Sequence, residues 1–400
     1  MLVLQRSVST LPHPTEPALQ AHQPSNLTLP PHYGPRASGA FAGTRVSGSP
    51  LAYHDFLMRA IVFDSPGGAE VLRPAEVSPP QLAPGRVRIA VTATSVNRAD
   101  LLQRRGLYPP PPGASEILGL ECCGLVTEVA AGVRSPAPGD RVMALLAGGG
   151  YAEETVVDWR SVLPAPATLS DAEAGAFPEV FLTAFVNLFQ LGGLTTGGWA
   201  LVHGGSGGVG TAAIALAREA GARIAVTAGS PERCRRCLAL GADIALDYRT
   251  DDLAAALEHA TGGDGVDLVM DCVGGSTVAS NLSLLRTGGR LVQIGLMGGA
   301  RTELDLRLLM SRRLTLVGST LRSRPDEEKG AIVAAFLGRF GEALRAGRLR
   351  PVIHRVLPLA AAAEAHRLLE SGEVFGKIAL DVRADNAVSR PPSARSSDRR

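Results

Sequence analysis

The stretch Val202–Ala217, VHGGSGGVGTAAIALA, decides the fold expected of this chain. It overlaps the end of a short apolar run, Trp199–His203, and finishes in an alanine-rich segment typical of a helix. Glycine has no side chain to fill a core, but it lets the backbone turn tightly and approach another group closely. The stretch therefore predicts a strand, a glycine loop and a helix, with the loop presented to a ligand.

The glycines Gly205, Gly207 and Gly210 have the spacing G-x-G-x-x-G. Between a strand and a helix this pattern is typical of dinucleotide binding. The first glycine permits the tight turn, the second lets the backbone approach the pyrophosphate, and the third lets the helix pack on the sheet. Gly208 and Val209 begin the helix, whose free N–H groups and positive dipole end favour phosphate. We predict that all five residues bind the cofactor; the alternative is a glycine-rich turn without a ligand.

The end of the next strand, Arg223–Gly229, indicates which cofactor the loop receives. NAD-binding folds usually place Asp or Glu about 20 residues past the glycines, to hold the ribose 2′-hydroxyl. Here Ser230 follows the strand, with Arg233 one helical turn further, and no acid repels a 2′-phosphate. The sequence therefore favours NADPH over NADH. Ser230 before Pro231 also suits a helix N-cap, and Arg233 is equally consistent with a solvated surface arginine.

Composition and periodicity divide the chain into segments of different character. Residues 1–57 are proline-rich without apolar periodicity, which predicts a disordered extension before a natural start at Met58. Closely spaced apolar runs predict a barrel-like β domain, and strands alternating with helices predict a doubly wound parallel sheet, so the expected class is α/β. The segments are the extension 1–57, a first catalytic part 58–176, a dinucleotide-binding domain 177–312, a second catalytic part 313–383 and a disordered tail 384–400.

Charge and composition exclude several classes of function. The 400 residues carry 40 basic and 38 acidic side chains, a net charge of +2, which is not the basic footprint of a nucleic-acid binder. No apolar run reaches membrane-spanning length, and residues 1–57 resemble neither a secretory nor a mitochondrial leader. Five cysteines are too few for a disulfide framework, so we expect a reducing compartment, the cytoplasm. Cys234 and Cys237 are interpreted as an incidental pair within a helix, and Cys122 and Cys123 as small buried residues.

The motifs of the chain, taken in order, resemble the medium-chain dehydrogenase/reductase superfamily. They are NRADLLQRRGLYPPPPGA, ILGLE, HGGSGGVGTAAI, TAGS, DLVMDCVGG, GLMGG and STLRSR, and the resemblance spans about Met58 to Val382. Within the superfamily the chain is most similar to the zinc-independent NADPH quinone oxidoreductases, the zeta-crystallin-like group. The resemblance implies a GroES-like β-barrel catalytic domain interrupted by a Rossmann domain, an active site in the cleft between them, and a homodimer or homotetramer.

Zinc-dependent members of the superfamily hold their metal with a Cys near Asn97, a His near Leu120 and a further residue. A catalytic zinc needs about three N, S or O protein ligands, and asparagine and leucine do not fill that role. The sequence also has no four-cysteine lobe for structural zinc. We therefore expect no metal, and hydride transfer onto an electron-poor quinone or enone. Glu121 is interpreted as a leftover of the zinc-type motif, and Asp271, at the carboxyl end of a strand, as a ligand neighbour or a cap.

The resemblance also implies individual site residues. Tyr108, before a four-proline run that stiffens its loop, resembles a cleft tyrosine whose hydroxyl stabilises an oxyanion and delivers a proton; the alternative is a packing tyrosine. Asn97 resembles the asparagine near the nicotinamide ribose, or it organises its loop. Tyr248 resembles a residue flanking the adenosine phosphate, or it packs beside the adenine. Thr183 and Lys377 resemble cofactor-cleft residues.

We therefore expect an NADPH-dependent quinone oxidoreductase with a small quinone or enone as substrate, and no nucleic-acid or membrane partner. The nearest alternative is an NADPH-dependent enone or enoyl-thioester reductase on the same scaffold. A phosphopantetheine substrate favours basic residues at the pocket mouth, and Arg104, Arg105, Arg322 and Arg324 leave that open. The non-enzyme alternative is an NADPH-sensing or RNA-binding protein, recognised by cofactor binding without turnover or by salt-sensitive RNA binding.

Overall fold

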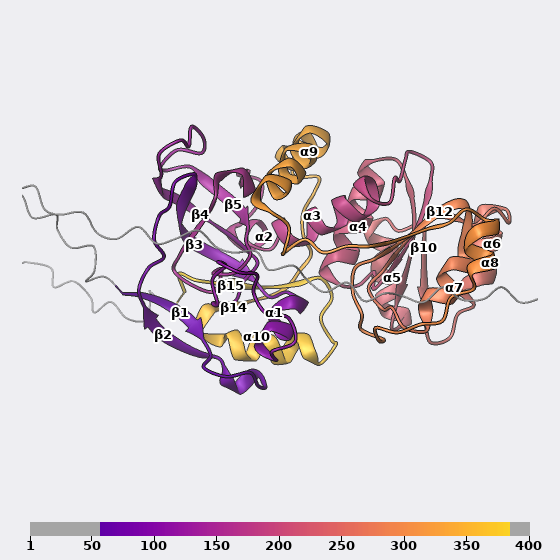
Figure 1. Ribbon diagram of the computed structural model, residues 1–400, viewed down its shortest axis with the longest axis horizontal. Coiled ribbons are helices and arrows are strands. Elements are labelled where there is room, and N and C mark those ends of the chain that lie inside the picture. Colours follow the sequence, from indigo (N-terminus) through magenta and orange to yellow (C-terminus); the bar gives the residue numbers. More distant parts are fainter. Residues whose placement is uncertain (1–56, 385–400) are drawn as a thin grey trace, which may run out of the picture. The chain divides into compact units, whose positions relative to one another are not determined.

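A computed structural model describes residues 57–384 of the chain. Their strands form a six-stranded sheet, a seven-stranded sheet and a two-stranded hairpin (Figure 1). The expected extension and tail lie outside the described residues, apart from Leu57 and Ala384. The α/β class predicted from the sequence is confirmed.

The six-stranded sheet is parallel throughout. Its strands are β8 Trp199–His203, β9 Arg223–Ala228, β10 Ile244–Asp247, β11 Val266–Asp271, β12 Leu285–Gln293 and β13 Thr315–Gly318. They lie in the order β10-β9-β8-β11-β12-β13, which is the order of a doubly wound dinucleotide-binding fold. Ligands of such sheets bind beyond the carboxyl ends of the strands where the order reverses, here β8 and β11.

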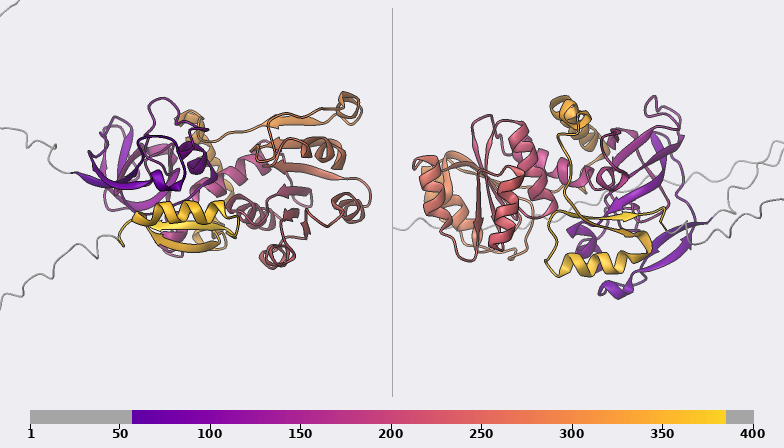
Figure 2. Two further views of the ribbon diagram at one scale, coloured as in Figure 1. Left: turned by 90° about the horizontal axis from the view of Figure 1, so that it is seen from below. Right: turned by 180° about the vertical axis from the view of Figure 1, so that it is seen from behind.

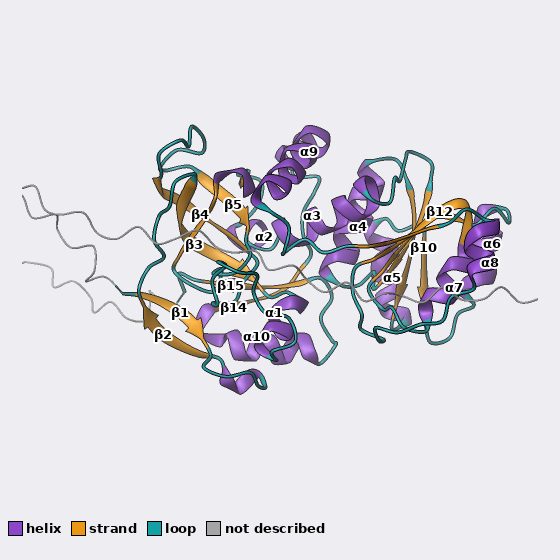
Figure 3. Ribbon diagram, in the orientation of Figure 1, coloured by secondary structure: helices purple, strands orange, loops and turns teal. Residues whose placement is uncertain are grey.

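Helices cover both faces of this sheet because successive residues of a buried strand point to opposite sides. In β8, Ala200 and Val202 belong to the same core cluster as the apolar residues of α4, whereas Leu201 packs with Val278 of α7. Figures 1 and 3 show α4 and α5 on one face and α6, α7 and α8 on the other. The helices are α4 Gly208–Glu219, α5 Pro231–Leu240, α6 Leu253–Thr261, α7 Thr277–Leu284 and α8 Leu306–Ser311.

The seven-stranded sheet is antiparallel except where its two C-terminal strands pair. Its strands are β3 Arg86–Ser95, β4 Glu121–Val129, β5 Arg141–Leu145, β6 Glu154–Asp158, β7 Val162–Pro164, β14 Ile353–Pro358 and β15 Lys377–Asp381, and the separate hairpin joins β1 Met58–Val62 to β2 Arg73–Val77. β15 pairs with β3, so the end of the chain completes a sheet begun near residue 86 (Figure 2). This is the β-rich part that the sequence predicted as GroES-like.

The remaining helices lie beside the antiparallel sheet. They are α1 Arg98–Arg104, α2 Asp171–Ala174, α3 Pro178–Phe185, α9 Asp326–Arg345 and α10 Ala362–Glu370, with the short turns η1 Ala69–Val71, η2 Trp159–Ser161 and η4 Leu359–Ala361 and a π-helical turn η3 Val186–Gln190. Aromatic rings join α3 to α9: Phe185 meets Phe336 edge-on with ring centroids 5.6 Å apart. Among residues 57–384, no helix is both long and apolar enough to span a bilayer.

The parallel sheet continues past the boundary expected at Arg312. β13 pairs in parallel with β12, from the partners Arg290 and Thr315 to Gln293 and Gly318. The boundary between residues 312 and 313 is therefore too early, because it removes the sixth strand of the sheet. β13 has only four residues, most of them exposed, so it carries no buried apolar pattern. Its sequence therefore did not show whether it belongs to the edge of this sheet or to the second catalytic part.

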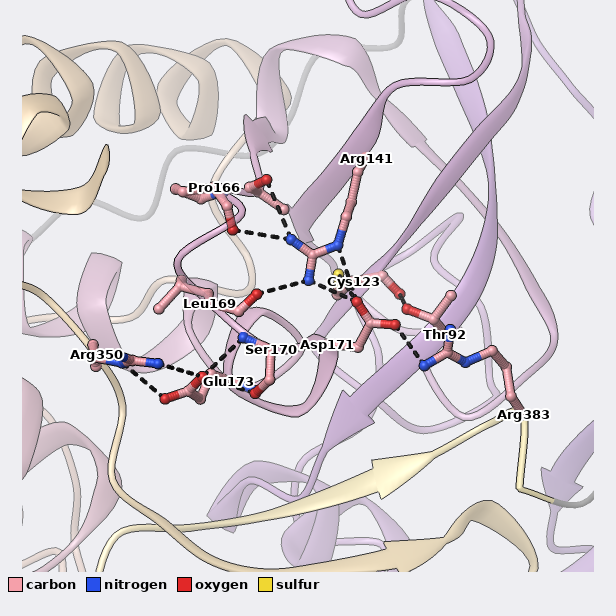
Figure 4. A network of polar contacts seen from close by, with 11 residues as sticks. Thr92, Cys123, Arg141, Pro166, Leu169, Ser170, Asp171, Glu173, Arg350 and Arg383 are labelled. Atoms are coloured by element: carbon pink, nitrogen blue, oxygen red, sulfur yellow. Dashed lines mark hydrogen bonds and ion pairs between the residues drawn. The ribbon is translucent and has the colours of Figure 1, made fainter. Parts of the chain in front are cut away.

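An arginine cluster holds α2 against the antiparallel sheet (Figure 4). Arg141, at the start of β5, donates to the Asp171 carboxylate at 2.6 Å and to three carbonyl oxygens of the loop before α2. Arg383, which follows β15, reaches the other oxygen of Asp171 at 2.6 Å. Because α2 leads directly into α3, this cluster also positions the helix that carries Thr183.

All five cysteines of the chain are free thiols in the described part. Cys234 and Cys237 are buried in α5, and burial raises the pKa of the Cys237 thiol to about 11. Cys122 and Cys123 are buried in β4, as the sequence predicted. These thiols stay protonated at neutral pH, which agrees with an incidental C-x-x-C pair.

Candidate functional site

The glycine loop follows β8 and makes its turn one residue earlier than predicted. Gly204 has a left-handed φ of +76°, and its carbonyl accepts a hydrogen bond from the Gly207 N–H at 3.0 Å. Gly205 serves a different purpose: a Cβ there would lie 2.5 Å from Cβ of Val226 in β9. Gly205 is therefore required by its packing against the neighbouring strand, and the turn itself belongs to Gly204.

Gly207 and Gly210 differ in what surrounds them. Gly207 is the N-cap residue of α4, and an added Cβ would meet nothing closer than the Gly204 carbonyl at 3.4 Å, so the space outside it is free for a ligand. A Cβ on Gly210 would lie 2.6 Å from Cα of Gly205, which shows that the helix packs directly on the loop. With α4 beginning at Gly208, followed by Val209, the loop fits a dinucleotide pyrophosphate.

The end of β9 holds Ser230, Arg233 and, from the neighbouring strand, Tyr248. Ser230 caps α5 by accepting from the Arg233 N–H at 3.3 Å, which confirms the N-cap role. The guanidinium of Arg233 donates to the Gly372 carbonyl, so this arginine is tied to the chain before β15. Tyr248 is 63% exposed, and a Cβ on Gly229 would lie 3.0 Å from its hydroxyl.

Arg249 is a cation at this place that the sequence reasoning missed. It is exposed, and its guanidinium lies 5.7 Å from the centre of the Tyr248 ring. The signal was its position next to Tyr248, just after a strand that runs parallel to β9. Arg249 is thus better placed than Arg233 to supply a free charge beside the end of β9.

Asn97, Glu121 and Lys377 come together in a buried cluster. The Lys377 ammonium lies 2.9 Å from Oε1 of Glu121 and donates to Oδ1 of Asn97 at 2.5 Å and to the Val96 carbonyl at 2.9 Å. The Asn97 amide nitrogen donates to the same Glu121 oxygen at 2.9 Å. Lys377 is 3% exposed and Glu121 is 0% exposed, so the two charges compensate each other inside the protein.

Glu121 is the centre of this cluster and not a leftover of another motif. Besides Lys377 and Asn97, its carboxylate accepts from the Ser95 hydroxyl at 2.5 Å and from the Glu179 N–H at 2.9 Å. It therefore joins β3, β4, β15 and the first turn of α3. This role could not be read from the sequence, because the partners of Glu121 come from three separate segments: residues 95–97, the start of α3 and β15.

Lys377 also connects the cluster to the glycine loop. A Cβ on Gly208 would lie 2.5 Å from Cδ of Lys377, so the lysine stem covers the first residue of α4. The preceding residue, Gly376, donates its N–H to the Ser206 carbonyl at 2.8 Å. Lys377 therefore lies beside the glycine loop, and its role as a cofactor-cleft residue stays a prediction.

Glu179, the second residue of α3, is an acidic group that the sequence reasoning missed. Its Oε2 is sealed from solvent and has no hydrogen-bond partner among the described residues. Burial and, next, the negative charge of Glu121 raise its pKa to about 8. The carboxyl is therefore mostly protonated at neutral pH. A lone acid in the apolar run FPEVFLTAF was the available signal.

Tyr108 lies half-buried against Arg322, whose guanidinium is 5.4 Å from the ring centre. Arg322 donates to the Tyr108 carbonyl at 3.3 Å, to the Ala147 carbonyl at 2.8 Å and to Oε1 of Gln103 at 2.6 Å. Burial raises the pKa of the Tyr108 phenol above its ordinary value, while the charge of Arg322 acts in the opposite direction. Tyr108 is thus a protonated hydroxyl on a loop that Arg322 holds in place.

The four arginines considered for a pocket mouth have different positions. Arg322 and Arg104 are buried, and Arg104 pairs with Glu370 at 2.5 Å. Arg105 is exposed and shares Glu370 at 2.6 Å. Arg324 is partly exposed, donates to the Thr320 carbonyl and lies 3.5 Å from Glu328.

The remaining candidates have mainly structural contacts. Asp271 is fully buried and accepts from the N–H of Val273 at 2.6 Å and from the side chains of Thr277 and Asn281, which favours the capping role. The Thr183 carbonyl accepts from the Asn187 amide at 2.7 Å, while its side chain is partly exposed. Among residues 57–384, no group of three or more His, Cys, Asp or Glu side chains is placed to hold a metal ion.

Family models match both parts of this architecture. Residues 83–167 match the model of the alcohol dehydrogenase GroES-like domain, and residues 208–336 match that of the zinc-binding dehydrogenases. A solved NAD-dependent alcohol dehydrogenase is 34% identical, with a TM-score of 0.70 over 81% of this chain and 100% of its own. The chain belongs to the medium-chain dehydrogenase/reductase family, as the sequence predicted.

Other similar proteins include two reductases and a synthase. The Escherichia coli quinone oxidoreductase, solved with NADPH, is 29% identical with a TM-score of 0.71, covering 81% of this chain and 99% of its own. The CurK enoyl reductase is 26% identical with a TM-score of 0.72 over the same shares. The phthioceranic/hydroxyphthioceranic acid synthase of Mycobacterium tuberculosis is 33% identical over 82% of this chain. The chain spans only 16% of that synthase.

Proposed function

We propose that this chain is a zinc-independent NADPH:quinone oxidoreductase. The observation that carries the proposal is the identity of the residues, Asn97 and Leu120, at the positions where zinc-dependent relatives are expected to place metal ligands. The Asn97 amide oxygen accepts from Lys377 and its amide nitrogen donates to Glu121, so both polar atoms are already used. Leu120 is apolar and buried. These residues do not fit a catalytic zinc, which needs about three N, S or O ligands. Hydride transfer without a Lewis acid suits an acceptor that is already electron-poor, such as a quinone.

The proposed cofactor is NADPH, held by the glycine loop and by the ends of β9 and β10. Gly207 and the N-terminus of α4 would receive the pyrophosphate. Ser230, Tyr248 and Arg249 would receive the 2′-phosphate, since the end of β9 and the two residues after it, Gly229 and Ser230, hold no acid to repel it. When bound there, NADPH supplies the hydride.

The chain's own residues position the cofactor and hold a proton. The side-chain stem of Lys377 packs on Gly208, and its ammonium contacts Asn97 and Glu121. Lys377 therefore holds the glycine loop in a defined position relative to Asn97. Hydride addition to a quinone leaves a hydroquinone anion, and one proton completes the product. Tyr108 is the proposed donor, and the carboxyl of Glu179, protonated at neutral pH, is a second source of a proton.

The test is oxidation of NADPH by the purified full-length chain, with NADH as control. The acceptors are an ortho-quinone, a para-quinone, an enone and a crotonyl thioester. The proposal expects quinone turnover with NADPH preferred. Turnover of the thioester or enone alone replaces it by the alternative below, and tight NADPH binding without turnover of any acceptor supports a sensor.

The alternative function is an NADPH-dependent enoyl-thioester reductase on the same scaffold. It is favoured by the similarity to the CurK enoyl reductase and to the phthioceranic/hydroxyphthioceranic acid synthase, of which this chain covers 16%. A homodimer or homotetramer, a cytoplasmic location, and the roles of Thr183 and Arg233 at the cofactor stay predictions.

A further inference from the structure

A hollow of about 790 Å³ lies away from the glycine loop. Its walls are the loop after Tyr108 (residues 111–115), the segment 145–149, β6, and the start of α9 with the residues before it. Asn97, Glu121 and Lys377 do not line it. A volume of this order accommodates a small organic molecule.

Lys329 is the residue of this hollow whose charge lacks a partner. It lies in the first turns of α9, lines the hollow and is only 5% exposed. No described carboxylate forms an ion pair with its ammonium. Asp326, the acid whose charge acts on it most strongly, is already bound by Arg86 at 2.7 Å. A buried cation is costly unless a counter-charge compensates it. An anion bound in the hollow would supply that counter-charge to Lys329.

Ser161, in the wall of the same space, carries a second polar group without a partner. Its side chain is 1% exposed and lines the hollow, and Oγ has no hydrogen-bond partner in the described part of the chain. Its position is fixed relative to α9, because a Cβ on Gly330 would lie 2.6 Å from Cβ of the neighbouring Arg160. A hydroxyl that is buried without a partner is uncommon and calls for a ligand or a bound water.

The charges around the hollow are unbalanced toward the positive. The charged lining residues are four cations, Arg86, Arg322, Arg324 and Lys329, and two acids, Glu154 and Asp326. Arg86 neutralises Asp326, and Glu154 is bound by Arg88 at 3.1 Å from outside the lining. Arg322 is held by neutral acceptors, so its charge also acts on the hollow. Between these groups lie apolar side chains, Ile117, Leu145, Leu146 and Val156.

We propose that this hollow binds an organic anion, a carboxylate or phosphate group on an apolar body, with the Lys329 ammonium as counter-ion and the Ser161 hydroxyl as hydrogen-bond donor. The apolar walls receive the body of the ligand. Arg322 lines the hollow and also holds Tyr108, so an occupant acts on the loop that carries the candidate proton donor. The anion comes either from an acidic arm of the substrate or from a separate effector.

Binding of hexanoate to the full-length chain tests the site without NADPH or acceptor, so the result does not depend on the proposed function. Hexanamide, which has the same body without the charge, is the matched probe. Calorimetry is expected to show hexanoate binding, with hexanamide at least about tenfold weaker, the factor that ~1.4 kcal/mol represents. Equal binding of the two probes, or no hexanoate binding at concentrations up to about 10 mM, the weak end for a small ligand, overturns the proposal.

Variants locate the site. Lys329→Met and Ser161→Ala are expected to weaken hexanoate binding, and Lys329→Arg to retain it; the arginine variant keeps the test valid if the methionine variant fails to fold. Arg105→Gln removes one exposed positive charge outside the hollow and is expected to change nothing. Unchanged binding in Lys329→Met, or equal loss in Arg105→Gln, contradicts the site.

Steady-state kinetics then distinguish the two sources of the anion. Hexanoate that competes with the acceptor and raises its KM assigns the hollow to an acidic arm of the substrate. Hexanoate that changes kcat while the acceptor KM stays constant assigns it to an effector. Kinetics that hexanoate leaves unchanged at saturation contradict the coupling to Tyr108 through Arg322.

Discussion

The Lys377 ammonium lies 2.9 Å from Oε1 of Glu121, and both side chains are buried. Through this pair the strand β15 is tied to β4, and the stem of the lysine covers the start of α4 at Gly208. The pair therefore does two things at once. It stabilises the interior of the antiparallel sheet, and it sets where the glycine loop lies relative to Asn97.

Lys377→Met is expected to destabilise the protein by about 3–5 kcal/mol, because it leaves the Glu121 carboxylate buried without a counter-charge. The double variant Glu121→Gln/Lys377→Met is expected to recover part of this loss, since neither charge then remains. Urea unfolding of the three proteins measures the effect. Arg73→Gln, which breaks an exposed pair with Asp64, is the control and should change little. A double variant that is no more stable than Lys377→Met would contradict the coupling.

Gly207→Ala and Gly210→Ala separate ligand binding from folding. An alanine Cβ at position 207 has ordinary contacts within the protein, so this variant is expected to fold at a cost below about 1 kcal/mol, typical of an N-cap change. It is expected to bind NADPH at least about tenfold more weakly, because the Cβ occupies the space for the pyrophosphate. An alanine at 210 meets Cα of Gly205 and should lower the melting temperature instead. Unchanged NADPH affinity in Gly207→Ala would show that the pyrophosphate lies elsewhere.

Ser230→Asp is expected to move the cofactor preference from NADPH toward NADH. Aspartate caps a helix as well as serine does, so folding is preserved, while its charge repels a 2′-phosphate and accepts from a 2′-hydroxyl. The ratio of kcat/KM for the two cofactors should fall by about 10- to 100-fold, or ~1.4–2.7 kcal/mol. Ser230→Asn is the matched control, because it caps without a charge and should keep the preference. Equal ratios for the aspartate and asparagine variants would place the 2′-phosphate away from this residue.

Glu179→Gln is expected to gain stability relative to the natural chain as pH rises from 5 to 8. The pKa of Glu179 is about 8 in the folded protein and 4.5 as its ordinary value, so the folded state holds a proton that the unfolded state releases. The contribution of this carboxyl to stability is therefore fully present below pH 4.5 and is lost as pH rises through 8. Glutamine removes the dependence. Unfolding free energies that stay parallel for both proteins between pH 5 and 8 would show that Glu179 ionises normally.

Tyr108→Phe is expected to lower kcat with quinones by about 100-fold, the lower end of the range for a general acid. The KM for NADPH should stay constant, because the phenol is proposed to act on the acceptor. Tyr248→Phe keeps its ring beside the end of β9 and serves as the comparison, with little effect on kcat. A kcat for Tyr108→Phe equal to that of the natural chain would assign protonation to Glu179 or to water.

Much of the cofactor fold follows from the sequence, because its signals are local. The spacing of Gly205, Gly207 and Gly210 between an apolar run and a helix identified the loop, and Ser230 before Pro231 identified the cap. The role given to Gly205 was displaced by one residue, since the position of a left-handed φ within a run of glycines has no local marker. The end of the parallel sheet was also misplaced, because pairing of β13 with β12 depends on a partner more than 20 residues away.

By itself the sequence determined the α/β class, the dinucleotide loop, the missing acid after β9 and the membership in the dehydrogenase/reductase family. These depend on short-range spacing, where backbone geometry and helix dipoles act within a few residues. The tertiary structure alone decided the site around Glu121 and the hollow around Lys329. Lys377 meets Asn97 across 280 positions of sequence. That Oε2 of Glu179, Oγ of Ser161 and the ammonium of Lys329 have no partner among residues 57–384 depends on which groups the fold places around them. Burial raises the free-energy cost of an unpaired charge. The groups that lie beside a buried charge are set by tertiary contacts, which the local sequence does not specify.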